Sequence, residues 1–287
     1  MTPFVIPFPQ IDPVLIEIGP LAIRWYSLAY IAGLVLGWRY IVMLVRNKPL
    51  WGGKSPATVE DIDDLLVWTT LGVIIGGRLG YVLFYGIIYY PEIYLGNPLN
   101  AFKVWEGGMS FHGGLLGVTL AIIFFCRRRG LDMFKVGDLV AAAVPIGLFF
   151  GRLANFINGE LYGKVSNVPW AMVFPDPQAG PLPRHPSQLY EAFLEGIVIF
   201  VMLRYLTHNT KILERPGLVA GTFLASYGLF RAFVEIFRDS EAFIWAPNSG
   251  LTMGMFLSVP MWVAAGLFFY WALNDRPKFT LPKHQPK

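Results

Sequence analysis

Seven long apolar runs dominate this 287-residue chain and limit what it can fold into. Each is long enough for a helix to cross the roughly 30 Å hydrocarbon core of a bilayer. Hydrophobic residues make up 55% of the chain and charged residues only 15%, too apolar a balance for a water-soluble domain. We therefore predict an all-α integral membrane protein with about seven transmembrane helices. The expected spans are 18–45, 64–89, 109–126, 136–156, 188–206, 216–237 and 251–273.

The segments between the spans predict a single membrane-embedded domain, 1–287, with one folded head. Residues 158–186 contain six prolines, which rules out a span, yet the segment is too apolar for a free linker. We expect it to form a small extracytoplasmic head. Residues 89–108 are rich in tyrosine, tryptophan and proline, as in segments at a membrane interface. The first twenty residues hold no lysine or arginine, so we expect no cleavable signal peptide.

Basic residues are distributed unequally between the two sides of the membrane. Fourteen lysines and arginines follow the first, third, fifth and seventh spans, and only four lie on the opposite side. Because cytoplasmic loops carry the excess of positive charge, this bias predicts an outer N-terminus and a cytoplasmic C-terminus. We expect a bacterial inner-membrane location. The net charge of +4 therefore indicates membrane topology here, and we expect no nucleic-acid partner.

Four ionisable residues on four spans are predicted to lie at one depth. Arg78, Arg152 and Arg231 each stand fourteen or fifteen residues beyond the expected cytoplasmic start of a span. At 1.5 Å per residue this places them about 21 to 23 Å across the membrane. His112 reaches the same level on a helix that runs the other way. Charged residues inside spans are costly and usually functional, so this layer predicts a polar site opening to the outer leaflet.

Several of these residues also allow a structural interpretation. His112 could be a structural histidine at a helix start or a general base, because an imidazole titrates near neutral pH. Arg152 and Arg231 could pair with Glu160 or Glu235, or could hold a phosphate through their planar guanidinium groups.

Other residues limit the alternatives. Tyr227 stands four residues before Arg231 and shares its helix face. Cys126 is the only cysteine and is expected to pack in an apolar environment. No histidine or carboxylate stands at metal-ligand spacing around His112, so we expect no metal and no cofactor. Glycines four apart predict close helix packing; these pairs are Gly33 and Gly37, Gly76 and Gly80, Gly113 and Gly117, and Gly147 and Gly151.

Motifs along nearly the whole chain resemble those of the bacterial prolipoprotein diacylglyceryl transferases. They are Arg24-Trp25-Tyr26, GGRLGYVLFY at 76–85, WEGGMSFHGGL at 105–115, GRLANFINGELYG at 151–163, RHPSQLYE at 184–191 and YGLFRAFVEIFR at 227–238. Ala154 stands where many members carry glycine. The resemblance implies transfer of the diacylglyceryl group of phosphatidylglycerol to the lipobox cysteine thiol of a prolipoprotein. A thioether forms and glycerol phosphate leaves, in the first step of bacterial lipoprotein maturation.

The resemblance also implies roles for the polar residues. Arg152 and Arg231 would bind the phosphate and stabilise the leaving group, and His112 and Tyr227 would deprotonate or orient the thiol. The expected substrate-binding residues are Tyr26, Arg78, Asn155, Asn158, Glu160, Gly163 and Arg238. The partners would be phosphatidylglycerol, the prolipoprotein signal peptide and membrane lipid.

Two other classes of protein were weighed against an enzyme of this kind. A lipid or solute transporter can also contain a polar site between glycine-broken helices, although a single outer layer of charge argues against transport. A membrane-embedded protease or phospholipase is disfavoured, because the sequence contains no Gly-x-Ser-x-Gly, no His-Glu-x-x-His and no paired intramembrane aspartates.

Overall fold

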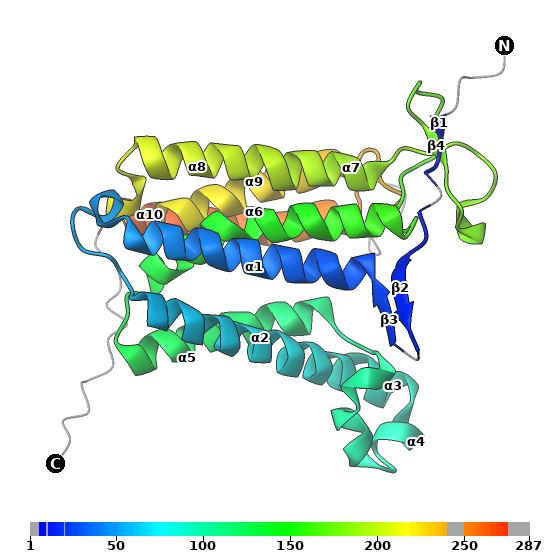
Figure 1. Cartoon of the computed structure of the whole chain (residues 1–287), viewed down its shortest axis with the longest axis horizontal. Coiled ribbons are helices and arrows are strands. Elements are labelled where there is room, and N and C mark those ends of the chain that lie inside the picture. The colour runs from blue at the N-terminus through cyan, green and yellow to red at the C-terminus, as the bar shows by residue number, and fades with distance from the viewer. Residues whose placement is uncertain (1–5, 10, 20, 240–249, 275–287) are drawn as a thin grey trace.

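The computed structural model describes residues 6–9, 11–19, 21–239 and 250–274 and shows a bundle of long helices (Figure 1). Five helical segments in this part are long and apolar enough to cross a membrane. They confirm the predicted membrane protein. The five are α1 (Trp25–Arg46), Val59–Tyr89, which contains α2 (Val59–Tyr81), η2 (Val82–Gly86) and α3 (Ile87–Tyr89), then α5 (Phe111–Arg129), α6 (Met133–Ile157) and α10 (Met253–Leu273).

Two further helical segments occupy the positions of the fifth and sixth predicted spans. The first runs without a break through α7 (Ser187–Glu191), the π-helical η6 (Ala192–Val198) and α8 (Ile199–Asn209). The second is the apolar helix α9 (Leu218–Val234), which has 17 residues. The count of seven spans depends on these two segments and stays a prediction.

The predicted start of the first span at residue 18 is wrong. Residues before Trp25 form an antiparallel hairpin of β2 (Val14–Ile18) and β3 (Leu21–Arg24), and α1 begins only at Trp25. Gly19 lies in the turn with φ of +59°, a conformation that glycine adopts without strain. The β-branched residues on either side favour strands over a helix. The apolar run that predicted the first span therefore included part of this hairpin as well as α1.

Capping residues explain where the helices begin. Thr58 and Asp61 form a reciprocal capping box, so α2 starts at Val59, five residues before the predicted position. Gly217 precedes α9 without a capping side chain of its own. The Asp138 carboxylate of α6 caps α9 instead, because it accepts hydrogen bonds from the Gly217 and Ala220 amides at 2.7 and 2.8 Å. This buried carboxylate fixes the start of α9 against α6.

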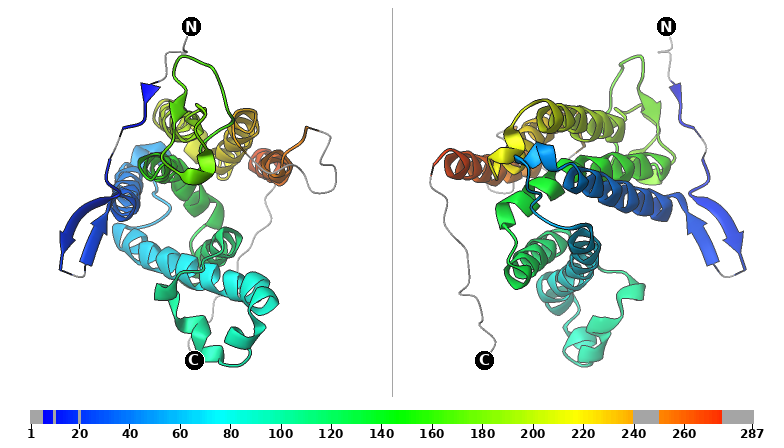
Figure 2. Two further views of the ribbon diagram at one scale, coloured as in Figure 1. Left: turned by 90° about the vertical axis from the view of Figure 1, so that its right-hand side faces the viewer. Right: turned by 60° about the vertical axis from the view of Figure 1, so that its left-hand side comes forward.

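The helices form two groups, seen end-on in Figure 2. Helices α1, α6, α8, α9 and α10 make one layer, and α2 with α5 makes the other. A Cβ on Gly33 would stand 3.1 Å from the Gly147 Cα atom, so α1 and α6 pack closely at these glycines. Between α2 and α5, a Cβ on Gly76 would overlap the Gly113 carbonyl oxygen. The predicted close packing is confirmed at these glycines, whereas a Cβ on Gly151 would meet nothing within 4 Å.

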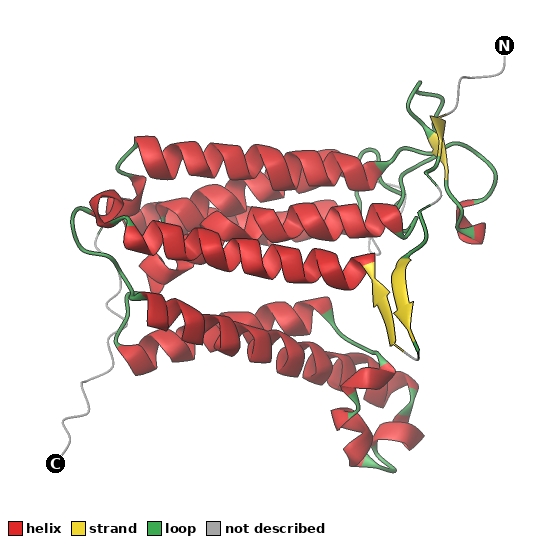
Figure 3. Ribbon diagram, viewed as in Figure 1, coloured by secondary structure: helices red, strands yellow, loops and turns green. Residues whose placement is uncertain are grey.

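The two ends of the bundle differ. At one end Arg129 pairs with Asp61 and Asp64, and the side chains of Leu44, Phe125 and Cys126 are buried in a common core. All strands of the described chain lie at the other end (Figure 3). There β1 (Ile6–Pro7) pairs in parallel with β4 (Met172–Val173) of the 158–186 segment. The short helices between residues 89 and 108 lie at this end too.

These short elements are brief and irregular. Residues 89–108 contain α4 (Pro91–Tyr94), η3 (Pro98–Phe102) and η4 (Val104–Glu106), with several exposed aromatic side chains. The 158–186 segment contains η5 (Pro177–Ala179). The connections η1 (Lys48–Trp51) and η7 (Ile212–Glu214) pack against each other at the opposite end.

Candidate functional site

The site is centred on Glu191, where α6, α7 and α9 meet. Helix α7 begins at Ser187, whose hydroxyl donates to the Leu161 carbonyl at 3.0 Å. The next residue, Gln188, donates through Nε2 to the Glu160 carbonyl at 2.6 Å. These bonds hold the first turn of α7 against the end of α6. Glu191 and Glu195 stand four residues apart, so both carboxylates face the same side of this helical segment.

Three arginines surround the Glu191 carboxylate. Arg152 Nε on α6 lies 3.3 Å from Glu191 Oε2, and Arg231 Nη1 on α9 lies 3.6 Å from Oε1. Arg238 Nη1 donates to Oε1 at 2.6 Å. Because one carboxylate contacts three guanidinium groups from three parts of the chain, Glu191 fixes their relative positions.

Two further glutamates complete a network of three arginines and three carboxylates. Glu195 Oε2 lies 3.7 Å from Arg152 Nη2, and Glu235 Oε1 lies 2.5 Å from Arg231 Nη2 and 3.6 Å from Arg238 Nε. The Tyr227 side chain lies close to Arg152. The formal charges balance, which reduces the cost of placing six ionised groups inside a membrane protein.

Burial differs between the two kinds of charged residue. The side chains of Glu191, Glu195 and Glu235 are fully buried, at 0% exposure, whereas those of Arg152, Arg231 and Arg238 are 18%, 17% and 14% exposed. The carboxylates therefore lie behind the guanidinium groups and leave part of each arginine accessible. Positively charged donors held in this way are suited to bind an anionic group such as a phosphate.

A second polar group lies beside this network. Asn155 Nδ2 donates to Glu160 Oε1 at 2.7 Å, and its side chain lies close to Tyr26. The Tyr26 and Tyr30 hydroxyls are 3.2 Å apart. The turn after α6 is tight, with φ of +58° at Leu161, an uncommon value for a residue with a side chain. Before it, Gly159 has φ of +69° and the Glu160 amide donates to the Asn155 carbonyl at 3.1 Å, which brings Glu160 back onto Asn155.

The structural interpretation expected Glu160 as a possible ion-pair partner of the arginines, and this partner was wrong. Glu160 binds Asn155, and the carboxylates beside Arg152 are Glu191 and Glu195. The expected pair of Arg231 with Glu235 is present. The reason for the difference is the turn at Gly159, which reverses the chain after α6 and places Glu160 against Asn155.

Arg78 and His112, expected in the same layer, have other surroundings. Arg78 is 5% exposed and donates to the backbone carbonyls of Asn100, Ala101, Gly107 and Gly108 at 2.5 to 3.2 Å. The exposed His112 side chain lies against the Phe111 ring at the start of α5. No ion pair or hydrogen bond of the described chain joins either residue to the arginine and glutamate network.

Gly163 and Asn158 lie in the chain around the network. A Cβ on Gly163 would overlap the Phe237 carbonyl oxygen and would stand 2.8 Å from the His185 Cβ atom, so Gly163 allows two segments to cross. Asn158 is the C-cap of α6. Burial lowers the pKa of His185, and its Nδ1 atom lies 3.0 Å from the Tyr190 hydroxyl. These contacts join the head to α7 and α9.

Glu191, Glu195 and Gln188 are site residues that we did not nominate from the sequence. Glu191 ends the RHPSQLYE motif, and two carboxylates four residues apart inside an apolar run are as unusual as an intramembrane arginine. The depth analysis considered arginine and histidine alone. A search for acidic residues within the expected spans would have found the pair.

The fold and this network define a class: a multi-pass membrane protein with an arginine-rich site for an anionic group, backed by buried carboxylates. Residues 13–271 match the family described as prolipoprotein diacylglyceryl transferase. A relative from Phenylobacterium zucineum named phosphatidylglycerol--prolipoprotein diacylglyceryl transferase is 52% identical, over 98% of this chain and 99% of its own. Relatives of the same name from Paramagnetospirillum magneticum and Rhodospirillum rubrum are 55% and 54% identical, over 96% of this chain and 98% and 97% of theirs. The chain belongs to the prolipoprotein diacylglyceryl transferase family.

Proposed function

We propose that the protein transfers the diacylglyceryl group of phosphatidylglycerol to the cysteine thiol of a prolipoprotein lipobox. The observation that carries the proposal is the network in which Glu191 holds Arg152, Arg231 and Arg238 with their guanidinium groups partly exposed. The substrate phosphate is an anion of the kind that such donors bind. The family and the named relatives support the choice of substrates.

The reaction is an alkyl transfer. The thiol sulfur attacks the carbon of the diacylglyceryl group that is bound to a phosphate oxygen. A carbon–sulfur bond forms, and the bond between this carbon and the phosphate oxygen breaks. Glycerol phosphate leaves with one more negative charge than the phosphodiester carried. In the proposed mechanism Arg152 and Arg231 stabilise this growing charge, because donors fixed in advance need no reorganisation as the charge develops.

The thiol must lose its proton during the attack. A free cysteine has a pKa near 8.5, so only a few per cent is thiolate at pH 7. We propose His112 as the base that accepts this proton and Tyr227 as the group that orients the sulfur beside the arginines. The exposed position of His112 at the start of α5 leaves its imidazole accessible to a substrate. Tyr26, Asn155, Asn158, Glu160 and Gly163 would shape the headgroup site.

The finer topology forms part of the same proposal. The chain would act as a single domain, 1–287, with seven spans, an outer N-terminus and a head at 158–186 beside the network. The site would open to the outer leaflet of the bacterial inner membrane. The excess of basic residues in the loops at the opposite end supports this orientation.

Reconstitution tests the proposed function against transport. The purified protein is placed in liposomes with phosphatidylglycerol labelled in the diacylglyceryl part, and a lipobox peptide is added. We expect labelled peptide and one glycerol phosphate for each peptide modified. Redistribution of labelled lipid with an unmodified peptide would instead indicate a transporter.

A further inference from the structure

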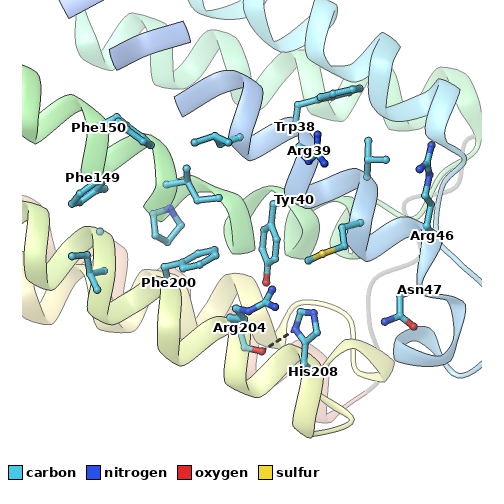
Figure 4. Close-up of a pocket in the computed structure, with 17 residues that line it drawn as sticks. Trp38, Arg39, Tyr40, Arg46, Asn47, Phe149, Phe150, Phe200, Arg204 and His208 are labelled. Atoms are coloured by element: carbon cyan, nitrogen blue, oxygen red, sulfur yellow. Dashed lines mark hydrogen bonds between the residues drawn. The ribbon is translucent and has the colours of Figure 1, made fainter. Parts of the chain in front are cut away.

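A large cavity lies between α1, α6 and the segment formed by η6 and α8, away from the arginine and glutamate network. Its volume is about 1170 Å³. Its walls are mostly apolar and include Ile146, Phe149 and Phe200 (Figure 4). All three wall elements belong to the helical bundle, so the cavity faces hydrocarbon rather than water in a membrane. An acyl chain has the chemistry that such walls accept.

Positive charge is concentrated at one end of this cavity. Arg39, Arg46, Arg204 and His208 line it together with Asn47, and no carboxylate is among its lining residues. Within the described chain none of the three arginines forms an ion pair. The Arg204 guanidinium lies over the Tyr40 ring, 5.9 Å from its centroid, and the His208 ring stacks on Tyr40 with a centroid distance of 6.4 Å. The three arginines of the cavity therefore have no carboxylate beside them among its lining residues.

A buried hydroxyl group points to the same place. Tyr40 is 6% exposed, and its hydroxyl has no hydrogen-bond partner among the described residues. Figure 4 shows its side chain directed toward Arg204 and His208. A buried hydroxyl without a partner costs free energy, so an acceptor at this position would satisfy it. A phosphate oxygen would accept from Tyr40 and from Arg204 together.

The cavity is separate from the candidate active site. Arg46 stands twenty residues after Tyr26 on α1, which corresponds to about 30 Å along the helix. That length is the full thickness of a hydrocarbon core. A headgroup bound at Arg46 would therefore lie in the opposite leaflet from a headgroup bound near Tyr26.

We propose that this cavity binds one anionic diacyl phospholipid from the leaflet opposite the reaction. Arg204 and the Tyr40 hydroxyl would bind its phosphate, Arg39 and Arg46 would add positive charge around the headgroup, and its acyl chains would lie on the apolar walls. The lipid would stabilise the packing of α1 on α6 and α8 and would not be consumed. A prolipoprotein signal helix fits less well, because signal peptides begin with a positively charged region that these arginines would repel.

Lipid binding by matched double variants tests the proposal. The full chain is purified in detergent, and retention of dioleoylphosphatidylserine is measured by native mass spectrometry. This lipid is anionic but differs in headgroup from the proposed substrate. We expect R46Q/R204Q to weaken binding about twentyfold, since each basic residue near an anionic lipid contributes roughly a fivefold effect. The control R127Q/R128Q removes two exposed arginines of α5 outside the cavity and should change binding less than twofold.

Other arms of the experiment identify the ligand. Phosphatidylcholine should bind at least tenfold more weakly than phosphatidylserine, and inorganic phosphate should not compete. Tyr40→Phe should weaken lipid binding while leaving the lipid-free melting temperature unchanged or higher. Equal losses in both double variants, equal binding of phosphatidylcholine, or competition by phosphate would overturn the proposal. Crosslinking of a lipobox peptide to a photoreactive residue at Leu36 would overturn it in favour of the signal helix.

The proposal stands apart from the proposed transferase reaction. At saturating phosphatidylglycerol and in lipid-rich bilayers, R46Q/R204Q should retain peptide lipidation because it leaves the Glu191 network intact. If the wild-type protein lipidates no peptide but shows the expected lipid binding, the transferase proposal alone fails. If it lipidates peptide and R46Q/R204Q binds lipid normally, the cavity proposal alone fails.

Discussion

The two helix groups each contain buried arginine, but they use it differently. In the α2 and α5 pair, Arg78 makes four hydrogen bonds, all to backbone carbonyls of the 100–108 segment. In the α6, α7 and α9 group, Arg152 and Arg231 contact carboxylates and remain partly exposed. An arginine bonded to carbonyls holds a segment in place, whereas an arginine anchored on one side by a carboxylate keeps donors for a ligand.

Backbone packing differs in the same way. Gly76 and Gly113 bring α2 and α5 into direct backbone contact, and the ion pairs between these helices, from Arg129 to Asp61 and Asp64, lie at the far end of the pair. Side chains fill the interface between α6, α7 and α9, and six of these are charged. Thus a rigid, glycine-packed pair stands beside a polar site, and His112 is the one proposed catalytic group on the glycine-packed side.

The largest expected effect comes from removing an arginine of the network. Arg231→Ala or Arg152→Ala should lower the transfer rate by about 10³-fold or more, because the leaving phosphate loses a fixed positive donor. The rate is measured with the purified variant in phosphatidylglycerol liposomes. Arg127→Ala, on the exposed end of α5, is the matched control and should keep wild-type activity. A fully active Arg231→Ala protein would remove this residue from the mechanism.

His112→Gln tests whether the glycine-packed pair contributes chemistry. General bases typically contribute about 10² to 10⁴-fold, so the variant should lose at least about 10²-fold in rate. The remaining activity should rise with pH as the thiol itself ionises. The measurement is the pH dependence of kcat/KM between about pH 6 and 8. Near-normal turnover with a flat profile would show that the arginine network prepares the thiol without His112.

Glu191→Gln tests the anchor of the network. The amide removes the charge that faces three arginines, and loss of one partner of a buried ion pair costs about 3 to 5 kcal/mol. Misplaced guanidinium groups should also lower transfer about 10²-fold. Thermal unfolding in detergent and the transfer assay measure the two effects. A stable and active variant would show that the arginines need no carboxylate to hold them.

A glycine pair gives the smallest expected effect and has a built-in control. Gly113→Ala places a Cβ against the Gly76 carbonyl oxygen and should cost about 1 to 3 kcal/mol of stability. Gly114→Ala meets its nearest atom, the Val73 carbonyl oxygen, at 3.6 Å and should be nearly neutral. Melting temperatures of the two variants are compared at equal detergent concentration. Equal melting temperatures would mean that α2 and α5 do not depend on this contact.

Much of the fold follows from the sequence because hydrophobicity alone determines it. The apolar runs predicted five of the spans, usually within a few residues, and glycine spacing predicted close helix packing without saying which helices pack together. The hairpin at 14–24 was missed because an apolar strand and an apolar helix have similar hydropathy. Gly19, which lies in the turn between the two strands, was the residue that could have indicated a hairpin.

The site was only partly predictable for a different reason. Arg152, Arg231 and Asn155 stood out because polar residues are rare in spans. Depth counting gives the position of a residue along the membrane normal but not its lateral position. It therefore placed Arg78 and His112 with the other arginines, although they lie on the other helix group. Which carboxylate each arginine contacts depends on the turn at Gly159 and on the start of α7, which spacing alone does not give.

The difference between the two kinds of arginine is tested most directly by one pair of charge-preserving variants. We measure kcat/KM for phosphatidylglycerol at fixed lipobox peptide in Arg231→Lys and Arg78→Lys. Lysine keeps the charge but loses the planar guanidinium, so we predict a loss of about 10²-fold or more for Arg231→Lys. Arg78→Lys should lower the melting temperature while each folded molecule keeps most of its activity. The reverse pattern, an active Arg231→Lys and an inactive but stable Arg78→Lys, would contradict the assignment of phosphate binding to the Glu191 network.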